Sequence, residues 1–311
     1  MIHQTEYEEI IVCLYDGHFD LGIAAFANSL VRFNYKGLVN IGYRGGPHPA
    51  WVKQLKAIGP EIYLLSEHIT LRFTPVKTNM HLGYYKPFFI KETFETYPTT
   101  DKLYYFDADI VVNSPWDIFS RWLDKGSCVC LDNAFHYIHY NHPWRKDWRS
   151  VSNLDESFYS HTNHYFNSGF LGIERGSMEL LNRWIYFTQQ YISQGGNINS
   201  FVKDAHSSFK GDQDLLNAAI TTSADIEVNV MGKEAMGFTL PATMMMHAIG
   251  DAKPWNKGFL KQLIKYGQKP NIADKAYFFH CKYPIRIFSE FDYKLKRLDL
   301  VLASFCGRFL G

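Results

Sequence analysis

The sequence predicts an α/β fold with a mostly parallel central sheet and helices on both of its faces. Short apolar runs alternate with longer amphipathic segments from residue 10 to residue 221, and this alternation is typical of βα units. The 311 residues, 46% of them hydrophobic, suffice for one large domain or two smaller ones with a sizeable core. A ligand of such a sheet is expected at the carboxyl ends of its strands.

The first βα unit shows the pattern most clearly. Residues 10–15 read Ile-Ile-Val-Cys-Leu-Tyr and predict a buried strand, and Asp16-Gly17 makes the turn that follows. Residues 21–33 carry apolar side chains at helical spacing along one stripe and predict an amphipathic helix. By the same criteria, further strands are predicted at 38–43, 61–65, 103–106, 110–112 and 165–173. Further helices are predicted at 49–58, 80–97 with an interruption near Pro87, 178–193 and 213–221.

Composition excludes several classes of protein. The 32 basic and 31 acidic residues leave a formal net charge of +1, which argues against a nucleic-acid binder, because that class carries a basic excess. The five cysteines contain no C-x-x-C pair, so a reducing compartment is expected rather than a disulfide framework. Residues 1–9 are polar and acidic, unlike a signal peptide. No stretch approaches the roughly 18–20 apolar residues that span a bilayer, and a cytoplasmic location is therefore expected.

Two acidic residues stand near the middle of the chain, between two predicted strands. Asp107 and Asp109 flank Ala108, directly after the strand at 103–106 and before the one at 110–112. Two carboxylates at this spacing can reach one hard cation, which prefers oxygen ligands. Buried there without a cation or donors, they would be costly. A D-x-D motif that stands alone is usually a solvated turn or a helix cap, so its interpretation depends on a partner.

A segment far downstream supplies that partner. Residues His247 to Trp255 read HAIGDAKPW and contain an imidazole for a metal, a glycine for close backbone approach and an ammonium group for phosphate. Alone, His247 would be interpreted as a core histidine and Lys253 as a surface lysine. Their shared spacing favours the functional interpretation.

Together these two segments resemble glycosyltransferase family 8, whose hallmarks are D-x-D and H-x-x-G-x-x-K-P-W. Residues 166–169 (FNSG) are similar to the N-[SA]-G strand of that family, and residues 212–217 (DQDLLN) to its D-Q-x-x-L-N helix start. The four segments occur in the order of the family, and the resemblance covers roughly residues 9–256. It implies the GT-A nucleotide-sugar fold and transfer with retention of anomeric configuration.

The resemblance implies a UDP-sugar donor with a divalent cation at its diphosphate. The expected metal ligands are Asp107, Asp109 and His247, and Mn²⁺ fits this oxygen and imidazole set better than Mg²⁺, which is the alternative. A cation there would neutralise charge as the glycosidic bond breaks. Lys253 would donate to the departing phosphate, and Gly250 would let backbone N–H groups approach it.

Four further residues are assigned near the transferred sugar by the same resemblance. Lys86 would lie near the phosphates and the sugar, the alternative being a solvated helix lysine. Asn167 would bond donor or acceptor hydroxyls, the alternative being a turn-forming Asn. Asp212 would contact the donor sugar, although it would also make a good N-cap. Gln213 would lie beneath the anomeric carbon. Because an amide is a poor nucleophile, the preferred mechanism is front-face, with the Gln213 amide oxygen stabilising an oxocarbenium-like sugar.

The nucleotide base is expected just after the first strand. Tyr15 could stack on the base and Asp16 could accept a hydrogen bond from it. Family members often carry acidic or Asn side chains here, and Tyr15 departs from that pattern. Asp107 and Ala108 are also assigned to the nucleotide, Asp107 through a bond to the ribose.

Residues 131–164 differ from the rest in being rich in aromatic residues and histidines. They predict an insertion that faces the acceptor. A second metal site is the alternative, although histidines 136, 139, 142, 161 and 164 match no compact ligand set. The expected division is a catalytic domain over residues 1–256 and a C-terminal extension over residues 257–311.

Residues 288–309 predict a basic amphipathic helix, with Lys and Arg interspersed among Leu and Phe. Such a helix can lie in a membrane interface. The resemblance supports a peripheral contact with the inner face of the membrane, since bacterial members that extend lipid-linked glycans often end this way. The alternative is a helix packed on the domain.

The sequence as a whole predicts a metal-dependent, retaining transferase that moves a hexose from a UDP-sugar to a glycan or a lipid-linked saccharide, as in polysaccharide biosynthesis. A sugar nucleotidyltransferase would show a Gly-rich loop with a basic residue after the first strand, which residues 13–20 lack. An inverting transferase would need a carboxylate base, which Asp214, Asp155 or Glu156 could supply. A non-catalytic glycan-binding module would be expected to have degraded ligands, yet every metal and phosphate position is intact.

Overall fold

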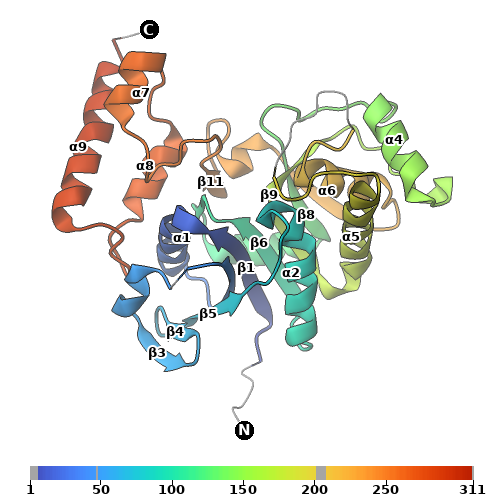
Figure 1. Cartoon of the computed structure of the whole chain (residues 1–311), viewed down its shortest axis with the longest axis horizontal. Helices are drawn as coiled ribbons and strands as arrows, with labels where there is room; N and C mark the ends of the chain where they lie inside the picture. Colours follow the sequence, from blue (N-terminus) through green and yellow to red (C-terminus); the bar gives the residue numbers. More distant parts are fainter. Residues whose placement is uncertain (1–5, 47, 201–207, 310–311) are drawn as a thin grey trace.

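A nine-stranded sheet crosses the centre of the molecule, with helices packed on both faces (Figure 1). The computed structural model describes residues 6–46, 48–200 and 208–309. Residues 1–5, part of the segment weighed as a signal peptide, lie outside the described residues. The strand order is β10-β8-β9-β6-β1-β2-β5-β4-β3. The strands are β1 Glu9–Asp16, β2 Gly37–Arg44, β3 Lys56–Gly59, β4 Ile62–Leu64, β5 Ile69–Pro75, β6 Lys102–Asp107, β8 Ser127–Leu131, β9 Phe166–Glu174 and β10 Val228–Met231.

The strands β5, β2, β1 and β6 run parallel to one another, and β9 joins β6 in the antiparallel direction. A separate two-stranded sheet pairs β7 (Ile110–Val112) with β11 (Met245–His247). The helices are α1 Asp20–Arg32, α2 Leu82–Thr96, α3 Trp116–Leu123, α4 Pro143–Ser152, α5 Met178–Ser193, α6 Asp212–Thr221, α7 Phe259–Tyr266, α8 Ile272–Phe279 and α9 Glu290–Cys306. The α/β fold class expected from the sequence is confirmed.

Strand β1 is buried on both faces because its side chains alternate between two cores. Ile11 and Cys13 belong to a hydrophobic cluster shared with α1 and α3. Ile10 and Val12 belong to a second cluster shared with α2, α5 and α6. Burial between two cores explains the continuous apolar run at residues 10–15. The parallel pairing of β1 with β6 places the carboxyl ends of both strands at one edge of the sheet.

Two predicted elements are wrong. The helix expected at 49–58 is a short 3-10 turn, Ala50–Gln54, followed by strand β3. Residues 56–64 pair as an antiparallel hairpin that continues onto β5, so sheet pairing overrides the helical pattern. The interruption expected near Pro87 is also absent, because α2 continues through it. Pro87 lies in the first half of this helix, where it removes the hydrogen bond to the carbonyl of Gly83 and its ring crowds that carbonyl without ending the helix.

The C-terminal helices α7, α8 and α9 lie together at one end of the molecule, at the upper left of Figure 1. A third hydrophobic cluster joins them to α1, β7 and β11, and it includes Trp255, Tyr293 and Leu300. Because Trp255 belongs to this cluster, the core is continuous across residue 256, where the sequence suggested a division. That division stays a prediction. None of the helices in the described part of the chain combines the length and apolar character needed to cross a membrane.

Candidate active site

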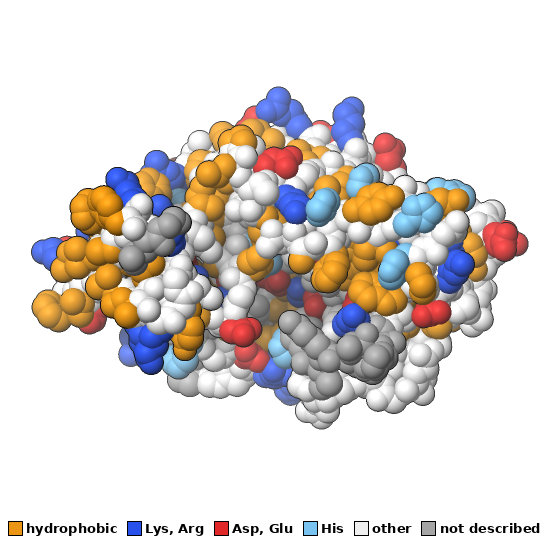
Figure 2. Space-filling view, turned by 90° about the horizontal axis from the view of Figure 1, so that it is seen from above, with side chains coloured by type: hydrophobic (Ala, Val, Ile, Leu, Met, Phe, Trp, Pro, Cys, Tyr) orange, Lys and Arg blue, Asp and Glu red, His pale blue; other side chains and the backbone are white. Residues whose placement is uncertain are grey.

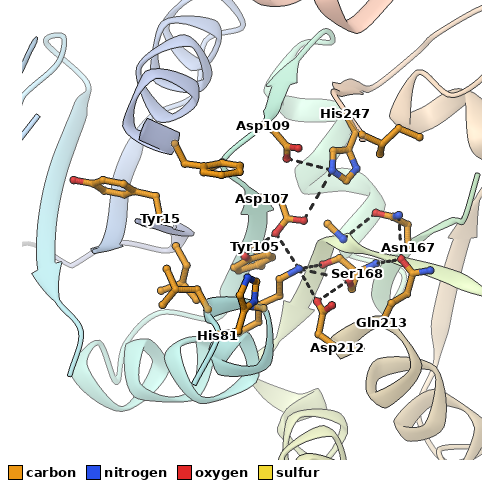
Figure 3. Close-up of a pocket in the computed structure, with 18 of the residues that line it drawn as sticks. Tyr15, His81, Tyr105, Asp107, Asp109, Asn167, Ser168, Asp212, Gln213 and His247 are labelled. Atoms are coloured by element: carbon orange, nitrogen blue, oxygen red, sulfur yellow. Dashed lines mark hydrogen bonds and ion pairs between the residues drawn. The ribbon is translucent and has the colours of Figure 1, made fainter. Parts of the chain in front are cut away.

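Two acids and one imidazole, 138 to 140 residues apart along the chain, converge at the carboxyl end of β6 (Figure 3). The Nε2 atom of His247 lies 3.2 Å from Oδ1 of Asp109 and 3.9 Å from Oδ2 of Asp107. The side chains of His247 and Asp109 are 7% and 6% exposed, whereas that of Asp107 is 26% exposed and faces the cavity. Across residues 6–46, 48–200 and 208–309, they form the only group of three His, Cys, Asp or Glu side chains arranged to hold a metal ion.

Strand pairing explains this convergence. The antiparallel pairing of β11 with β7 sets His247 opposite Ile110, and the backbone N–H of Ala248 donates to the carbonyl of Asp109 at 3.0 Å. Gly169 on β9 provides the space between the two motifs. A Cβ atom there would lie 2.5 Å from Cε1 of His247 and 3.0 Å from Oδ2 of Asp107. The glycine of the Asn-Ser-Gly segment therefore lets the imidazole approach the acids.

The donor set fits a divalent cation. Two carboxylates and an imidazole form the mixed oxygen and nitrogen set expected for Mn²⁺ or a related ion. Nε2 is the imidazole nitrogen that faces the two acids and would bind the ion, whereas the buried Nδ1 atom has no hydrogen-bond partner among the described residues. Burial would raise the pKa of Asp109, but the neighbouring His247 and Lys253 outweigh it and lower the pKa below its ordinary value. Asp109 is therefore ionised, as a ligand must be.

Lys86 connects the acids of β6 to helix α6. Its Nζ atom lies 2.9 Å from Oδ1 of Asp107 and 2.8 Å from Oδ2 of Asp212, and its side chain is 6% exposed. Burial would lower the pKa of Lys86, but the charges of the two acids outweigh burial and raise the pKa overall. The alternative interpretation of Lys86 as a solvated lysine is wrong. Asp212 is not an N-cap either, because Gly211 holds that position and the Asp212 carboxylate bonds Lys86 and Ser168.

Asn167 and Gln213 both line the cavity, and their side chains are hydrogen-bonded to each other. Nδ2 of Asn167 donates to Oε1 of Gln213 at 3.1 Å, and the backbone N–H of Ser168 donates to the same oxygen at 3.3 Å. Asn167 also donates to Asp132, and its own Oδ1 accepts from the N–H of Gly169. These bonds fix the direction of the Gln213 amide. Asn167 lies within strand β9, so its alternative role as a turn residue is wrong.

The HAIGDAKPW segment forms a loop whose charged end returns to the acids. Nζ of Lys253 lies 2.5 Å from Oδ2 of Asp109 and donates to the carbonyl of Ala248 at 3.0 Å. Gly250 has a φ of 100°, a conformation that favours glycine. Trp255 is buried between Phe19 and Tyr277. The tryptophan therefore braces the loop, while Lys253 and Gly250 line the cavity.

Tyr15 and Asp16 stand at the opposite end of the cavity. The Tyr15 ring stacks on Tyr43 with centroids 6.2 Å apart, and its hydroxyl points away from the acids in Figure 3. Asp16 is opposite Arg44 in the pairing of β1 with β2, and their side chains form an ion pair at 2.6 Å. Arg44 also donates to the carbonyl of Met80. The sequence analysis did not identify Arg44, although its position at the end of a parallel strand beside Asp16 is a usable signal.

These groups line one open cavity of about 540 Å³, a size typical of small-molecule sites. The predicted residues that line it are Tyr15, Asp16, Lys86, Asp107, Ala108, Asp109, Asn167, Asp212, Gln213, His247, Gly250 and Lys253. The structure thus brings all twelve together. Other residues that the sequence analysis gave no role also line the cavity, among them His81, Ile249 and Asp251. His81 caps helix α2 by accepting the N–H of Gly83, and burial lowers its pKa.

The three acids weighed as bases for an inverting reaction do not line this cavity. Asp214 is buried and accepts hydrogen bonds from the Tyr165 hydroxyl and the Lys210 backbone N–H, both at 2.6 Å. Burial raises the pKa of Asp214 to about 6. Asp155 caps a 3-10 turn by accepting from the N–H of Ser157, and Glu156 begins that turn.

The insertion at 131–164 contains helix α4, which packs on α5 and α6 (Figure 1). Buried Arg145 anchors it with hydrogen bonds to the carbonyls of Ile138 and His164 and to the Thr221 hydroxyl. Asp132, at the start of the insertion, bonds Asn167 in the site. The expected acceptor-facing role of the insertion stays a prediction.

Comparisons with known proteins agree on the fold. No protein-family model matches the sequence, and no curated protein matches it in a sequence comparison. Solved structures do match. The chain resembles the apo bifunctional glycosyltransferase WbbM with a TM-score of 0.58 and 14% identity, over 95% of this chain and 53% of that one. It resembles the galactosyltransferase LgtC, in complex with donor and acceptor sugar analogues, with a TM-score of 0.52 and 16% identity, over 92% and 99% of the two chains.

The glycosyltransferase GlyE of Streptococcus pneumoniae matches with a TM-score of 0.53 and 17% identity, over 96% of this chain and 64% of that one. The chain therefore spans about half the length of WbbM and under two thirds of GlyE. At these identities the likeness defines a fold. The fold is the GT-A nucleotide-sugar transferase fold, as the sequence resemblance implied.

Proposed function

We propose that this protein is a glycosyltransferase of family 8 that moves a hexose from a UDP-sugar to a saccharide acceptor, with retention of configuration. The observation that carries the proposal is the convergence of Asp107, Asp109 and His247 in one cavity of a GT-A fold, beside buried Lys86 and half-buried Lys253. The likeness to three glycosyltransferase structures supports the same class of reaction.

Asp107, Asp109 and His247 would hold a divalent cation, with Mn²⁺ the preferred ion. When bound, such an ion supplies positive charge to the diphosphate of the leaving group. Lys253 supports this assignment because its ammonium group is anchored beside Asp109 at the same end of the cavity. Its role is to donate to the departing phosphate, where negative charge develops. Gly250 leaves the loop backbone open to the same phosphate, since no atom lies within 4 Å of a Cβ built there.

At the sugar, Asp212 accepts hydrogen bonds from donor hydroxyls while Lys86 keeps it ionised, since the neighbouring lysine helps to lower the pKa of Asp212 against the effect of burial. Gln213, whose amide oxygen is held by Asn167 and Ser168, would lie beneath the anomeric carbon. In the front-face reaction, the bond from the anomeric carbon to the phosphate oxygen breaks and the bond to the acceptor oxygen forms on the same face. The acceptor hydroxyl proton goes to the released phosphate oxygen.

Inversion is the competing stereochemistry, and it needs a carboxylate base beside the acceptor hydroxyl. Asp214 is engaged by Tyr165 and Lys210, and Asp155 by Ser157, away from the cavity lining. These contacts favour retention. Proton NMR of the product made from an α-linked donor tests this, with an α-linked product expected and a β-linked product contradicting it.

The activity itself is tested with a thermal-shift panel of nucleotide sugars, each with and without Mn²⁺. Metal-dependent stabilisation by a UDP-sugar is expected, by about 2.7 kcal/mol at a ligand concentration of 100 Kd. His247→Ala should abolish the metal dependence, whereas His136→Ala, in the insertion, should keep it. A panel in which no UDP-sugar stabilises the protein more with Mn²⁺ than without it would contradict the proposal.

The role of Gln213 is tested by kinetics. Gln213→Ala should lower kcat more than about tenfold, which is about 1.4 kcal/mol of transition-state stabilisation. Retention of more than a tenth of kcat would remove Gln213 from the mechanism and leave the transferase assignment unchanged. The control is Asn182→Ala, which removes a polar side chain from α5 outside the cavity lining.

We also propose that the enzyme acts on a lipid-linked acceptor at the cytoplasmic face of a membrane, in polysaccharide biosynthesis. Helix α9 buries Tyr293, Leu300 and Ala303 against the domain and exposes apolar side chains on its other face. Phe291 is 75% exposed, Leu298 54% and Phe305 56%. Figure 2 shows hydrophobic side chains gathered at this end of the molecule with Lys and Arg beside them. A basic rim around an apolar face suits anionic lipid.

Vesicle flotation tests the membrane contact. The wild-type chain should float with vesicles that contain phosphatidylglycerol and much less with phosphatidylcholine alone. The double variant Leu298→Ser and Phe305→Ser should lose flotation, while Ile58→Ser, an exposed apolar position on β3, should keep it. Equal flotation of the double variant and wild type would remove the membrane claim.

A further inference from the structure

A second cavity lies beside the candidate active site and has no role in the mechanism above. Its volume is about 490 Å³, and it lies between the HAIGDAKPW loop and the segment that contains α7 and α8. Residues 249–251 line both this cavity and the active-site cavity. A Cβ atom at Gly250 would meet no other atom within 4 Å, so the boundary between the two cavities is open. We call the second cavity the α7–α8 pocket.

The α7–α8 pocket carries little net charge. Two basic residues, Lys257 and Lys269, face two acidic ones, Asp251 and Asp274. Lys257 is paired with buried Asp274 at 2.6 Å, and Asp274 also accepts the backbone N–H of Asn271. The charges deepest in the pocket are therefore already neutralised, which disfavours a phosphate or another strongly anionic ligand.

The remaining lining suits a ligand that carries many hydroxyl groups. The side-chain amides of half-buried Gln262 and exposed Gln268 line the pocket, and each offers both a donor and an acceptor. Ile249 is 36% exposed at the rim, and Phe259 lies in the wall. Amides pair with hydroxyls, while apolar side chains cover the C–H faces of a sugar ring. This combination favours a neutral saccharide.

We infer that the α7–α8 pocket is a subsite for the part of the acceptor saccharide that does not react. The inference rests on the proposed function, because an acceptor hydroxyl must reach the donor sugar in the first cavity. The sugars behind that hydroxyl then leave the first cavity over Gly250 and occupy the pocket. Helix α7 contains the pocket residue Gln262 and also Ile264, an exposed apolar residue at the same C-terminal end of the molecule as the exposed face of α9. One helix therefore connects the saccharide subsite to the membrane-facing surface.

The test fills the pocket without touching the active-site lining. Gln262→Trp puts a bulky ring into the pocket from α7, and Gln268→Trp does so from the loop after α7. Lys265→Trp is the matched control, because it adds the same ring to an exposed position of α7 outside the pocket lining. The full-length chain and the three variants are probed with an array of neutral and anionic oligosaccharides of one to four sugars, and separately with UDP and Mn²⁺ in a thermal-shift assay.

Wild type and Lys265→Trp should bind a neutral oligosaccharide of two or more sugars, and Gln262→Trp and Gln268→Trp should each bind it at least tenfold more weakly. All four proteins should be stabilised equally by UDP with Mn²⁺. Unchanged oligosaccharide affinity in both Trp variants, a preference for anionic glycans, or no retained oligosaccharide would overturn the inference. Loss of the UDP response in wild type would instead count against the proposed function.

Discussion

The Nζ atom of Lys86 lies 2.8 Å from Oδ2 of Asp212, and both side chains are almost completely buried. The same ammonium group lies 2.9 Å from Asp107, so one lysine pairs with an acid of the sheet and an acid of helix α6. Removing one partner of a buried pair leaves an uncompensated charge. Lys86 therefore supports both the stability of the fold and the chemistry of the site.

Lys86→Met should lower the free energy of unfolding by about 3–5 kcal/mol, because it strands Asp107 and Asp212. Adding Asp212→Asn should recover part of the loss, so the double variant costs less than the sum of the single ones. Urea denaturation of the four proteins measures this coupling. Lys91→Met, on the same helix with a partner at the surface, should change stability by less than about 0.5 kcal/mol. Strict additivity of the two changes would contradict the coupling.

Gly169→Ala should weaken metal binding while the protein stays folded. The new Cβ would lie 2.5 Å from Cε1 of His247, so the imidazole must move away from Asp107 and Asp109. Isothermal titration with Mn²⁺ should show at least a tenfold weaker affinity. Gly176→Ala is the matched control, because no atom lies within 4 Å of a Cβ built there. Equal Mn²⁺ affinity in the two variants would show that the close approach is not needed.

Buried His280 should make the protein less stable in mild acid. Burial lowers the pKa of His280 to about 4, below its ordinary value of roughly 6.5. As pH falls from about 6.5 to 4, the unfolded chain binds a proton that the folded chain does not bind, and stability is lost over that window. The loss is on the order of 2–3 kcal/mol.

His280→Gln should remove this contribution, so that its stability relative to wild type rises between pH 7 and pH 4.5. Urea denaturation at a series of pH values measures the difference. Asp214 acts in the opposite direction, because its raised pKa of about 6 makes stability fall as pH rises from about 4 to 6. The comparison must therefore be made between the single variant and wild type, and a constant difference across the series would contradict the assignment.

Arg44→Gln should weaken donor binding more than it slows the reaction, because Arg44 holds Asp16, which lines the cavity and is assigned to the nucleotide base. The Arg44–Asp16 pair at 2.6 Å is partly exposed, so its loss should cost about 0.5–1 kcal/mol. The expected result is a donor KM raised about two- to fivefold with kcat changed less than twofold. Arg72→Gln is the control, since Arg72 lies on neighbouring β5 and bonds Tyr97 instead. A fall in kcat with an unchanged KM would separate Arg44 from nucleotide binding.

The cluster of candidate metal ligands could be predicted from the sequence, because the spacing of the residues within each motif identifies them. Asp107 and Asp109 end a strand, and His247 opens a motif with fixed offsets, so neither depends on knowing the exact sheet register. The same holds for strand β1, whose continuous apolar run allows few environments other than a sheet buried on both faces. The other central strands were predictable from similar apolar runs, and helices α1, α5 and α6 from apolar side chains at helical spacing.

Elements that depend on tertiary pairing were not predictable. The second strand of the hairpin, β4, was predicted at 61–65, whereas the first, β3, is a strand because it pairs with β4, although the local pattern at 49–58 favours a helix. Arg44 stayed without a role because its signal, a place at the end of a strand beside Asp16, can be interpreted only once β1 is paired with β2. The packing of Arg145 beneath the insertion depends on carbonyl groups that sequence patterns do not reveal.

The short sheet of β7 and β11 has a consequence for the order in which the proposed ion-binding residues are synthesised. A nascent chain contains both aspartates long before it contains His247, and the third ligand is held in position by the pairing of Met245–His247 with Ile110–Val112. Translation must therefore pass residue 247 before the ligand set is complete. A chain that ends before residue 247 would lack both the third proposed ligand and the strand that pairs with β7.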